Sequence, residues 1–356
     1  MIKFAIVGCG RIARKHAGNL GENKIPGARL TAVCDIIESR AKEYGEKYNV
    51  PWYTDMHNMM KCENENIDVI DILTPSGDHA KNTVDLAPYG KHIIVEKPMA
   101  LTLHDADTMI EACDKHGIKL FVVKQNRLNL PVKKLREALE AERFGKMVMG
   151  TVRVRWCRDQ EYYDQDSWRG TWKHDGGCFA NQAIHHVDLL QWMMGEVETV
   201  FAKSATRLVD IEAEDTGVVV LKFKSGALGV IEATTATRPK DLEGSISILG
   251  EKGTVEIGGF AVNEMKIWNF LDDVDGSDRE EVLSTYKQNP PDVYGFGHTE
   301  YLTNVVDVIQ NEKAALVDGL AGRKSLELIA AIYESIETGK EVQVNFVPKK
   351  CRLGIR

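Results

Sequence analysis

A glycine-rich turn close to the start of the chain constrains the fold more than any other feature. Residues 3–8 form a short apolar run, residues 8–13 read GCGRIA, and a helix-forming stretch follows. In such a G-x-G-x-x-A turn, Gly8 permits a tight bend, Gly10 admits a pyrophosphate, and Ala13 lets helix and strand pack closely. An ordinary strand–turn–helix is the alternative. We predict a Rossmann unit that binds a dinucleotide, with contacts at Gly8, Gly10, Arg11 and Ile12.

An acid at the end of the second apolar run distinguishes between the two nicotinamide dinucleotides. Asp35 lies 22 residues beyond Ala13 (35 − 13 = 22). A carboxylate at this position accepts hydrogen bonds from a ribose diol and repels a 2′-phosphate. No arginine follows at Ile36 or Ile37 to bind that phosphate, so the sequence predicts NAD rather than NADP.

Length and charge narrow the remaining classes. The 356 residues suffice for two domains with a large core. The net charge of −8 argues against a general nucleic-acid or membrane surface, so an anionic substrate needs a local positive cluster. The seven cysteines never form C-x-x-C, which favours a reduced, cytoplasmic compartment and argues against a zinc site. We expect neither a signal peptide nor a membrane-spanning segment.

The pattern of apolar and polar residues changes near residue 124. Before it, apolar strands alternate with polar helices, which predicts a doubly wound parallel sheet in a domain over residues 1–123. The expected strands are 3–8, 29–35, 67–73, 92–96 and 119–123, and the helices 37–48, 78–89 and 102–116. After it, a helix over 132–143 and a segment over 147–158 precede alternating segments typical of antiparallel sheet: 199–208, 216–223, 228–235, 243–250 and 253–257. We expect a surface loop over 272–292, two closing helices, and a second domain over 124–356.

A second motif lies where one buried strand ends, in Glu96-Lys97-Pro98. Ligands bind beyond the carboxyl ends of strands in open α/β sheets, so Lys97 should point into the cofactor crevice. A lysine beside a nicotinamide can donate a hydrogen bond to a substrate hydroxyl. The alternative is a solvated residue at the end of a strand. Pro98 holds the chain extended or turned, and the sequence leaves its peptide isomer open.

A third motif is a Gly-Gly pair that leads into a predicted helix. Asn181 and His185 stand four residues apart, so they share one face of that helix. This pairing marks His185 as a candidate catalytic residue, although a histidine satisfied in the core is the alternative. His186 and Asp188 point elsewhere, and we expect them to cap or pair structurally. Adjacent histidines diverge on a helix, so we predict no metal site there.

Together the three motifs resemble the glucose–fructose/inositol dehydrogenase (Gfo/Idh/MocA) family in order and spacing, as do residues 322–340. The resemblance implies an α/β protein: an N-terminal Rossmann domain plus a C-terminal α+β domain. The second domain carries a large open, mostly antiparallel sheet that mediates homo-oligomers, a dimer or a tetramer. It also implies nicotinamide-dependent oxidation of a sugar or polyol hydroxyl, with Lys97 and His185 as the matching catalytic residues. Asn181 stands where the family usually has Asp. A neutral amide can orient His185 but cannot stabilise its imidazolium by charge.

One segment narrows the substrate. Residues 153–173 hold three of the six tryptophans and four arginines, the surface that a diphosphate and a base need. A solvated strand edge with a packed aromatic cluster is the alternative. Strand register puts Arg153 and Arg155 on one face, where some of these arginines could serve a subunit interface, and Arg158 on the other. With Asn181 and residues 124–127, the segment resembles the family subgroup that oxidises UDP-N-acetylglucosaminuronic acid at the sugar 3-hydroxyl for surface polysaccharides. In that subgroup, bound NADH is reoxidised by 2-oxoglutarate.

The candidate site follows from these motifs. We predict a catalytic group of Lys97, His185 and Asn181 and cofactor contacts at Gly8, Gly10, Arg11, Ile12, Asp35, Thr74, Pro75, His79, Glu96, Lys97, Gln125, Trp168 and Arg169. We predict substrate contacts at Lys97, Arg158, Tyr163, Asn181, His185 and His298, where a surface cap is the alternative role for His298. Two other functions stay open: a dehydrogenase of a free polyol or sugar such as inositol, and a non-catalytic sugar-nucleotide sensor.

Overall fold

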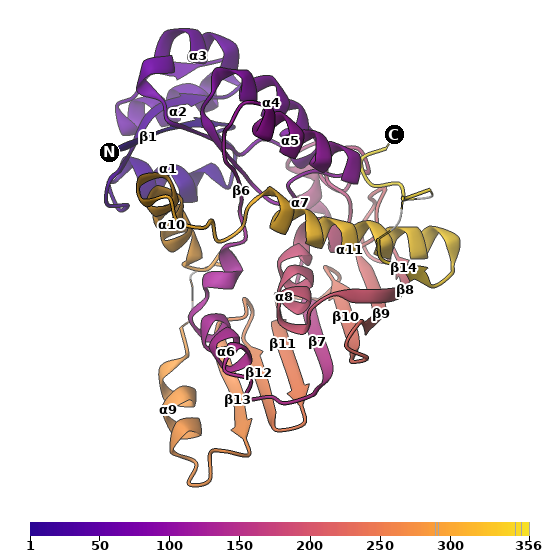
Figure 1. The fold of residues 1–356 in the computed structure, drawn as a ribbon. Coiled ribbons are helices and arrows are strands. Elements are labelled where there is room, and N and C mark those ends of the chain that lie inside the picture. Colours follow the sequence, from indigo (N-terminus) through magenta and orange to yellow (C-terminus); the bar gives the residue numbers. More distant parts are fainter. Residues whose placement is uncertain (289, 291, 346, 350, 356) are drawn as a thin grey trace. The chain divides into compact units, whose positions relative to one another are not determined.

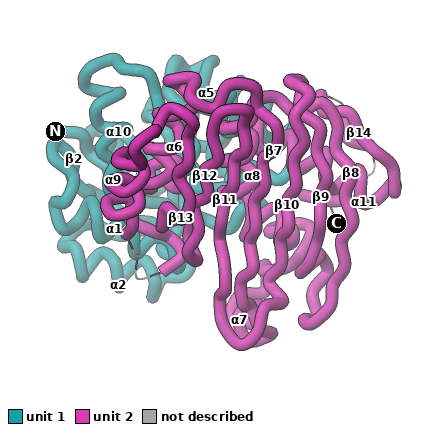
Figure 2. Tube along the Cα trace, turned by 90° about the horizontal axis from the view of Figure 1, so that it is seen from below, with its two compact units in different colours: residues 1–124, 298–323 teal, residues 125–297, 324–356 magenta. Residues whose placement is uncertain are grey.

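The chain forms two compact units. The structure, a computed structural model, describes residues 1–288, 290, 292–345, 347–349 and 351–355. Unit 1 comprises Met1–Lys124 and His298–Arg323, and unit 2 comprises Gln125–Gly297 and Lys324–Arg356 (Figure 2). The chain therefore returns to unit 1 after building most of unit 2, whereas the sequence suggested a single boundary after residue 123.

Unit 1 is built on a six-stranded, wholly parallel sheet in the order β3-β2-β1-β4-β5-β6. Figure 1 labels two of these strands, β1 and β6. The strands are β1 Ile2–Val7, β2 Ala28–Cys34, β3 Trp52–Tyr53, β4 Val69–Ile72, β5 His92–Val95 and β6 Leu120–Val122. The central strands are buried on both faces, which is why their sequences are near-continuous apolar runs. The strand order reverses between β1 and β4, and a ligand crevice opens at such a switch point.

The helices of unit 1 follow the expected alternation. They are α1 Ala13–Gly21, α2 Glu38–Tyr48, α3 Met56–Glu63, α4 His79–Leu86 and α5 Leu103–Lys115, with short 3-10 turns at Asn64–Asn66, Ser76–Asp78 and Ala87–Tyr89. Our sequence reading missed β3 and α3, although Asp55 caps α3 by accepting a hydrogen bond from the Asn58 backbone N–H at 2.7 Å. A late helix, α10 Gly297–Asn311, joins this unit, where Thr299 Oγ1 donates to Asn19 Oδ1 of α1 at 2.7 Å.

Unit 2 carries an eight-stranded sheet in the order β13-β12-β11-β7-β10-β9-β8-β14 (Figure 2). β7 and β10 pair in parallel and the other neighbours are antiparallel. The predicted fold class is thus confirmed. The strands are β7 Met147–Arg155, β8 Val197–Ala205, β9 Thr216–Phe223, β10 Leu228–Thr234, β11 Glu243–Gly250, β12 Gly253–Gly258, β13 Glu264–Phe270 and β14 Val342–Gln343.

One face of this sheet is covered by helices. They are α6 Leu130–Glu140, α7 Gln160–Asp164, α8 Ile184–Met194, α9 Ser277–Thr285 and α11 Gly319–Thr338, with a 3-10 turn at Gln125–Leu128 and a π-helix at Cys178–Gln182. α8 is buried on nearly every side because it packs against β7 and β11, and its buried residues include His185, His186 and Asp188. None of the helices in the described part of the chain combines the length and apolar character needed to cross a membrane.

The stretch 272–292 corrects one expectation. We read it as a surface loop, but it contains α9, and residues 289 and 291 lie outside the described residues. Val282 is the buried residue of this helix, so the sequence shows no apolar period there. Tertiary contacts hold α9 instead: the Trp268 indole N–H donates to Asp278 Oδ2 at 2.8 Å.

Candidate active site

The glycine-rich turn has the shape that a pyrophosphate requires. Gly8 has φ +101°, and a Cβ at this position would lie 2.7 Å from the backbone of Leu73 and Thr74, so only glycine fits. A Cβ at Gly10 would meet nothing within 4 Å, so the space above the turn stays open. Ala13 is fully buried and begins α1, whose first N–H groups face the same turn. The turn therefore fits the phosphates of NAD.

Asp35 is fixed beside this turn. Its Oδ2 accepts a hydrogen bond from the Cys9 backbone N–H at 2.7 Å, and its Oδ1 accepts from the Ile37 N–H at 2.8 Å. The sequence did not predict these contacts. Each carboxylate oxygen keeps a lone pair that a ribose hydroxyl can use. The next residue, Ile36, is 89% exposed. It is apolar, so it offers no positive charge that could bind a 2′-phosphate beside Asp35.

The loop after β4 meets the turn after β5 through one histidine. His79 is buried, with Nδ1 2.8 Å from the Pro98 carbonyl oxygen and Nε2 2.8 Å from the Thr74 carbonyl oxygen. Burial lowers the pKa of His79. Thr74, Pro75 and His79 therefore all follow the carboxyl end of β4, and His79 ties that segment to the turn after β5. Their cofactor contacts stay predictions.

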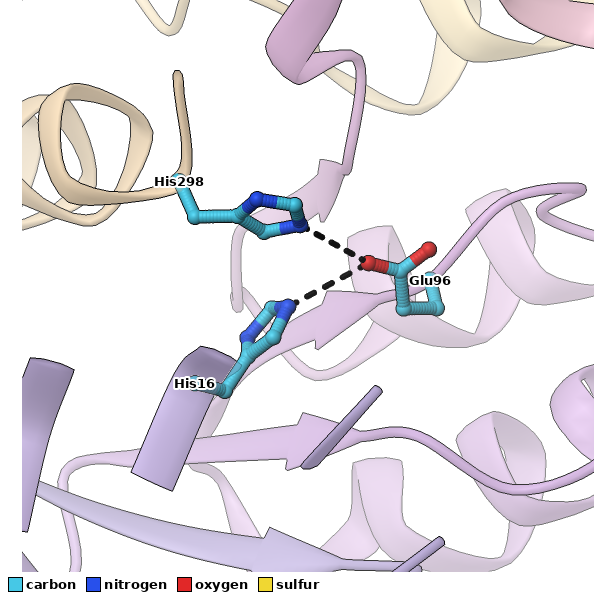
Figure 3. A group of neighbouring side chains, drawn as sticks. All are labelled: His16, Glu96 and His298. Carbon is cyan, nitrogen blue, oxygen red and sulfur yellow. Dashed lines mark hydrogen bonds and ion pairs between the residues drawn. The ribbon is translucent and has the colours of Figure 1, made fainter. Parts of the chain in front are cut away.

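Lys97 lies in a fixed turn directly after β5. Its side chain is half-buried, the Lys97–Pro98 peptide is cis, and the Lys97 backbone N–H donates to Glu96 Oε2 at 2.9 Å. Glu96 and His298 are both buried, and the His298 imidazole approaches the Glu96 carboxylate at 3.6 Å (Figure 3). The surface cap that we kept as an alternative for His298 is wrong, because the side chain is 2% exposed.

In unit 2, Asn181 and His185 do not belong to one continuous α-helix. Asn181 lies in the π-helix, where the Ala183 N–H donates to the Cys178 carbonyl at 2.8 Å, and His185 lies in the first turn of α8. We predicted that Asn181 and His185 share one helix face, which assumes 3.6 residues per turn throughout. The wider π-helical turn breaks that period. His185 is buried, with 6% of its surface exposed. π-helical turns are frequent at functional sites.

A buried carboxyl group that the sequence reading missed lies against Asn181. Asn181 Nδ2 donates to Asp175 Oδ1, and Asp175 Oδ2 accepts from the Gly170 N–H at 2.7 Å. Gln182 Nε2 in turn donates to Asn181 Oδ1 at 3.1 Å. Asp175 directly precedes the Gly-Gly pair, and that position was the one available signal. The amide that replaces the family's usual Asp is thus backed by an acid from a neighbouring turn.

Three residues that we predicted to be in the site meet around two that we did not predict. The predicted residues are Arg158, Arg169 and Asn181, and the other two are Tyr162 and Gln182. Arg158 Nε donates to Gln182 Oε1 at 3.2 Å, and Arg169 donates to the Tyr162 hydroxyl at 2.8 Å. Gln182 Nε2 also reaches the Tyr162 hydroxyl at 3.1 Å, which ties both arginines to Asn181. Each guanidinium lies over the Tyr162 ring, at 5.3 Å for Arg158 and 4.7 Å for Arg169. The Trp168 ring adds a second face to Arg169 at 4.7 Å.

Other predicted residues lie elsewhere in unit 2. The Tyr163 hydroxyl pairs with Thr235 Oγ1 at 3.1 Å, and burial raises its pKa. Gln125 is buried, and among the described residues its Oε1 has no hydrogen-bond partner, so a ligand amide would satisfy it. The pairing predicted for Asp188 is confirmed, because its carboxylate accepts hydrogen bonds from Nε and Nη2 of buried Arg127, both at 2.8 Å. His186 is fully buried beside the Trp156 ring, and among the described residues its ring nitrogens have no hydrogen-bond partner, so the cap or pair expected there is not found.

Behind the π-helix lies a second unpredicted acid, Glu214. Its Oε1 accepts hydrogen bonds from the Phe179 N–H and the Tyr333 hydroxyl, both at 2.9 Å, and the Gly177 N–H donates to that hydroxyl at 3.1 Å. A Cβ at Gly177 would lie 2.1 Å from Glu214 Oε2, so the Gly-Gly pair makes room for this carboxyl group. Burial raises the pKa of Glu214 to about 7.

Comparison with known proteins agrees with this fold. Residues 2–124 match the oxidoreductase family's NAD-binding Rossmann fold, and residues 136–344 match the C-terminal alpha/beta domain of the same family. The chain is therefore an NAD-dependent dehydrogenase. It belongs to the Gfo/Idh/MocA oxidoreductase family.

Three relatives span almost the whole chain. Myo-inositol 2-dehydrogenase of Thermotoga maritima is 32% identical over 353 residues, covering 97% of this chain and 99% of the relative. The WlbA dehydrogenase of Bordetella pertussis, solved with NADH and UDP-GlcNAcA, is 41% identical with a TM-score of 0.89, covering 97% and 98%. The WlbA dehydrogenase of Chromobacterium violaceum, solved with the same two ligands, is 43% identical with a TM-score of 0.89, covering 97% and 96%.

Proposed function

We propose that this protein oxidises the 3-hydroxyl of UDP-N-acetylglucosaminuronic acid with NAD, in the synthesis of surface polysaccharides. The observation that carries the proposal is the likeness to two dehydrogenases that bind UDP-GlcNAcA. Both exceed 40% identity over 97% of this chain, whereas the inositol dehydrogenase of T. maritima is 32% identical.

Lys97 and His185 divide the proton chemistry in this proposal. Bound NAD supplies the hydride acceptor. Lys97, at the end of β5, donates a hydrogen bond to the reacting oxygen, and His185 accepts the hydroxyl proton as the carbon–hydrogen bond breaks. Asn181 orients the imidazole. The buried Asp175 against Asn181 supports His185 as the base, because a nearby negative charge favours imidazolium.

The arginine–tyrosine cluster would receive the anionic part of the substrate. Arg158 and Arg169 converge on one polar cluster, and both lie over the Tyr162 ring. Each is also paired with one carboxylate, Arg158 with Asp241 at 2.9 Å and Arg169 with Asp166 at 3.1 Å. A neighbouring groove of about 530 Å³ suits a diphosphate poorly. Four carboxyl groups line it beside Arg169, at Asp164, Asp166, Asp210 and Glu212.

A substrate comparison tests the proposal directly. Purified protein with NAD should develop the absorbance of reduced nicotinamide on addition of UDP-N-acetylglucosaminuronic acid and lose it on addition of 2-oxoglutarate. Myo-inositol and free N-acetylglucosamine are the matched controls, because they lack the diphosphate. Equal or faster reduction with myo-inositol would replace the proposal by the second candidate, an inositol dehydrogenase, which the likeness to the T. maritima enzyme favours. Reduction with none of these sugars would favour a sensor.

The uncovered face of the sheet in unit 2 supports assembly with a second copy of the chain. Phe201, Val220 and Val230 stand side by side on β8, β9 and β10, and the first two are 37% and 51% exposed. The same face carries Arg155, which forms a two-point ion pair with Glu232 at 2.6 and 2.8 Å. A face that mixes apolar rows with both charges can pair with itself around a two-fold axis. Light scattering should show a dimer or tetramer, and Val220→Glu should reduce it to smaller species.

A further inference from the structure

Two buried imidazoles converge on one carboxylate oxygen behind Lys97. His16 Nε2 of α1 lies 3.2 Å from Glu96 Oε1, and His298 Nε2 at the start of α10 lies 3.6 Å from the same atom (Figure 3). The two rings meet edge to face, with centroids 5.2 Å apart. All three side chains are buried. The other carboxylate oxygen, Oε2, holds the Lys97 backbone N–H at 2.9 Å. Glu96 thus connects the imidazoles to the backbone of Lys97.

His16 makes this arrangement a charged one. Its Nδ1 lies 2.7 Å from Asp71 Oδ2, so both ring nitrogens face carboxylate oxygens, which only accept, and both must carry protons. Although burial opposes protonation, Asp71 and Glu96 raise the pKa of His16 to about 10. Burial alone would raise the pKa of Glu96, but its bonds to His16 and His298 hold that pKa well below the usual value. Both groups therefore stay ionised at neutral pH.

The other groups that face this network leave that balance intact. Burial lowers the pKa of His298, which is therefore neutral at neutral pH, and Lys15 of α1 acts on it in the same direction. The Tyr301 hydroxyl of α10 is near Asp71 and Glu96, and burial raises its pKa well above the ordinary value. His79 of α4 faces Glu96, and burial lowers its pKa. Among these groups, His16 is the imidazole that lies within hydrogen-bond distance of Glu96.

The residue after Lys97 is held as well. His79 approaches the Pro98 carbonyl oxygen at 2.8 Å and the Thr74 carbonyl oxygen at 2.8 Å. The backbone on both sides of Lys97 is thus bonded to buried side chains, while the Lys97 side chain remains half-buried. A side chain that must meet a reacting oxygen within a few tenths of an ångström needs such a fixed base, because a misplacement of about 1 Å can cost about 10²-fold in rate.

We propose that His16 and His298, acting through Glu96, are positioning residues that fix Lys97 for hydride transfer; this inference rests on the proposed role of Lys97. Neither imidazole needs to touch substrate or cofactor. The three ligand atoms of His16, Glu96 and His298 also lie within 4.8 Å of one another, a spacing that a metal site can have. The second carboxylate on His16 and its hydrogen-bond distance to Glu96 favour an ion pair, and metal analysis decides between the two.

A matched pair of substitutions at His298 tests the proposal. His298→Gln keeps an N–H donor that can reach Glu96, and His298→Leu removes it; His104→Leu, on an exposed position of α5, is the control. We expect His298→Leu and Glu96→Gln to lower kcat about 10- to 100-fold, with KM for NAD and the NADH dissociation constant little changed. His298→Gln should recover most of the rate. Normal kcat in His298→Leu and Glu96→Gln, or no recovery in His298→Gln, would overturn the proposal. So would one equivalent of zinc in the purified protein that His298→Leu loses.

A second measurement does not depend on the substrate. The rate at which an amine-selective reagent labels Lys97, relative to exposed Lys115, reports how firmly Lys97 is held. We expect faster relative labelling of Lys97 in Glu96→Gln and His298→Leu than in wild type, His298→Gln or His104→Leu. Equal labelling in all five proteins would overturn the positioning role. If the wild type oxidises none of the sugars tested, the proposed function fails, and this ratio still decides the inference.

Discussion

Two buried clusters of ionisable side chains, one in each unit, accommodate charge in opposite ways. In unit 1, His16 lies between Asp71 and Glu96, so the cation and the two anions neutralise one another in part. In unit 2, Glu214 is bonded to neutral donors, and within the described part of the chain its Oε2 has no hydrogen-bond partner. Each group lies next to the element that carries a predicted catalytic residue: Glu96 directly precedes Lys97, and Glu214 holds the turn that leads to His185.

The difference shows two solutions to the same problem of burying charge. A buried ion is tolerated when an opposite charge lies within hydrogen-bond distance, and removing either partner is then costly. A buried carboxyl group without such a partner keeps its proton instead. Unit 1 therefore holds a network whose charge is constant around neutral pH, whereas the carboxyl group in unit 2 changes its charge near pH 7.

The largest expected effect compares the two predicted catalytic residues. Lys97→Ala and His185→Ala should each lower kcat by about 10²–10⁴-fold, the range for positioned acid–base groups, while NADH still binds. Steady-state kinetics and nicotinamide fluorescence give the two quantities, with Lys115→Ala as the control for a lost surface charge. Near-normal kcat in either variant would show that the substituted residue has no catalytic role. The unit that carries it would then supply no catalytic residue of the two proposed.

Removing the buried imidazolium of His16 should destabilise the fold more than neutralising the buried carboxyl group of Glu214. His16→Leu leaves two carboxylates buried without their partner, so we expect a loss of about 3–5 kcal/mol in the free energy of unfolding. Glu214→Gln keeps the acceptor for Phe179 and Tyr333 and should cost less than about 1 kcal/mol at neutral pH. Urea denaturation followed by circular dichroism measures both. Equal losses would mean that the two networks do not differ as proposed.

The networks should also respond to pH in different windows. The pKa of Glu214 is raised from 4.5 to about 7, so folding keeps a proton that the unfolded chain has lost. Its stabilising contribution is complete below pH 4.5 and declines as pH rises to about 7, by roughly 3 kcal/mol. For His16 the decline begins near pH 6.5 and ends near 10. Between pH 5 and 7 the free energies of unfolding of wild type and Glu214→Gln should diverge by about 2 kcal/mol, and parallel curves would contradict the assignment.

Local motifs explain what the sequence could predict. The fold class, the glycine-rich turn and the acid Asp35 follow from residues that are neighbours in the chain, where spacing alone fixes geometry. Lys97 follows in the same way, because the end of a parallel strand has a known position in the sheet. Thr74 and His79 follow β4 closely in the chain, and their cofactor contacts stay predictions.

Long-range contacts explain what the sequence could not predict. Glu96 meets a histidine 80 residues before it and another 202 residues after it (298 − 96 = 202), and no local pattern marks either one. No local pattern marks the return of residues 298–323 to unit 1 either, because that return depends on contacts between residues far apart in the chain. The π-helix was missed because a period of 3.6 residues was assumed across Asn181 and His185.

The smallest expected effect tests whether Asp175 supplies the charge that Asn181 lacks. Asp175→Asn removes a buried acid bonded to Asn181, so the pKa of His185 should fall and the acid limb of the kcat/KM profile should move to lower pH by up to about one unit. Asn181→Asp alone places two acids in contact, and because one of them then keeps a proton, the limb should move little. The double variant, Asn181→Asp with Asp175→Asn, exchanges the two groups and restores one carboxylate, so its limb should return to the wild-type position or move above it. An acid limb that is identical in all four proteins would show that neither side chain acts on His185, and the base in unit 2 would then depend on its own burial alone.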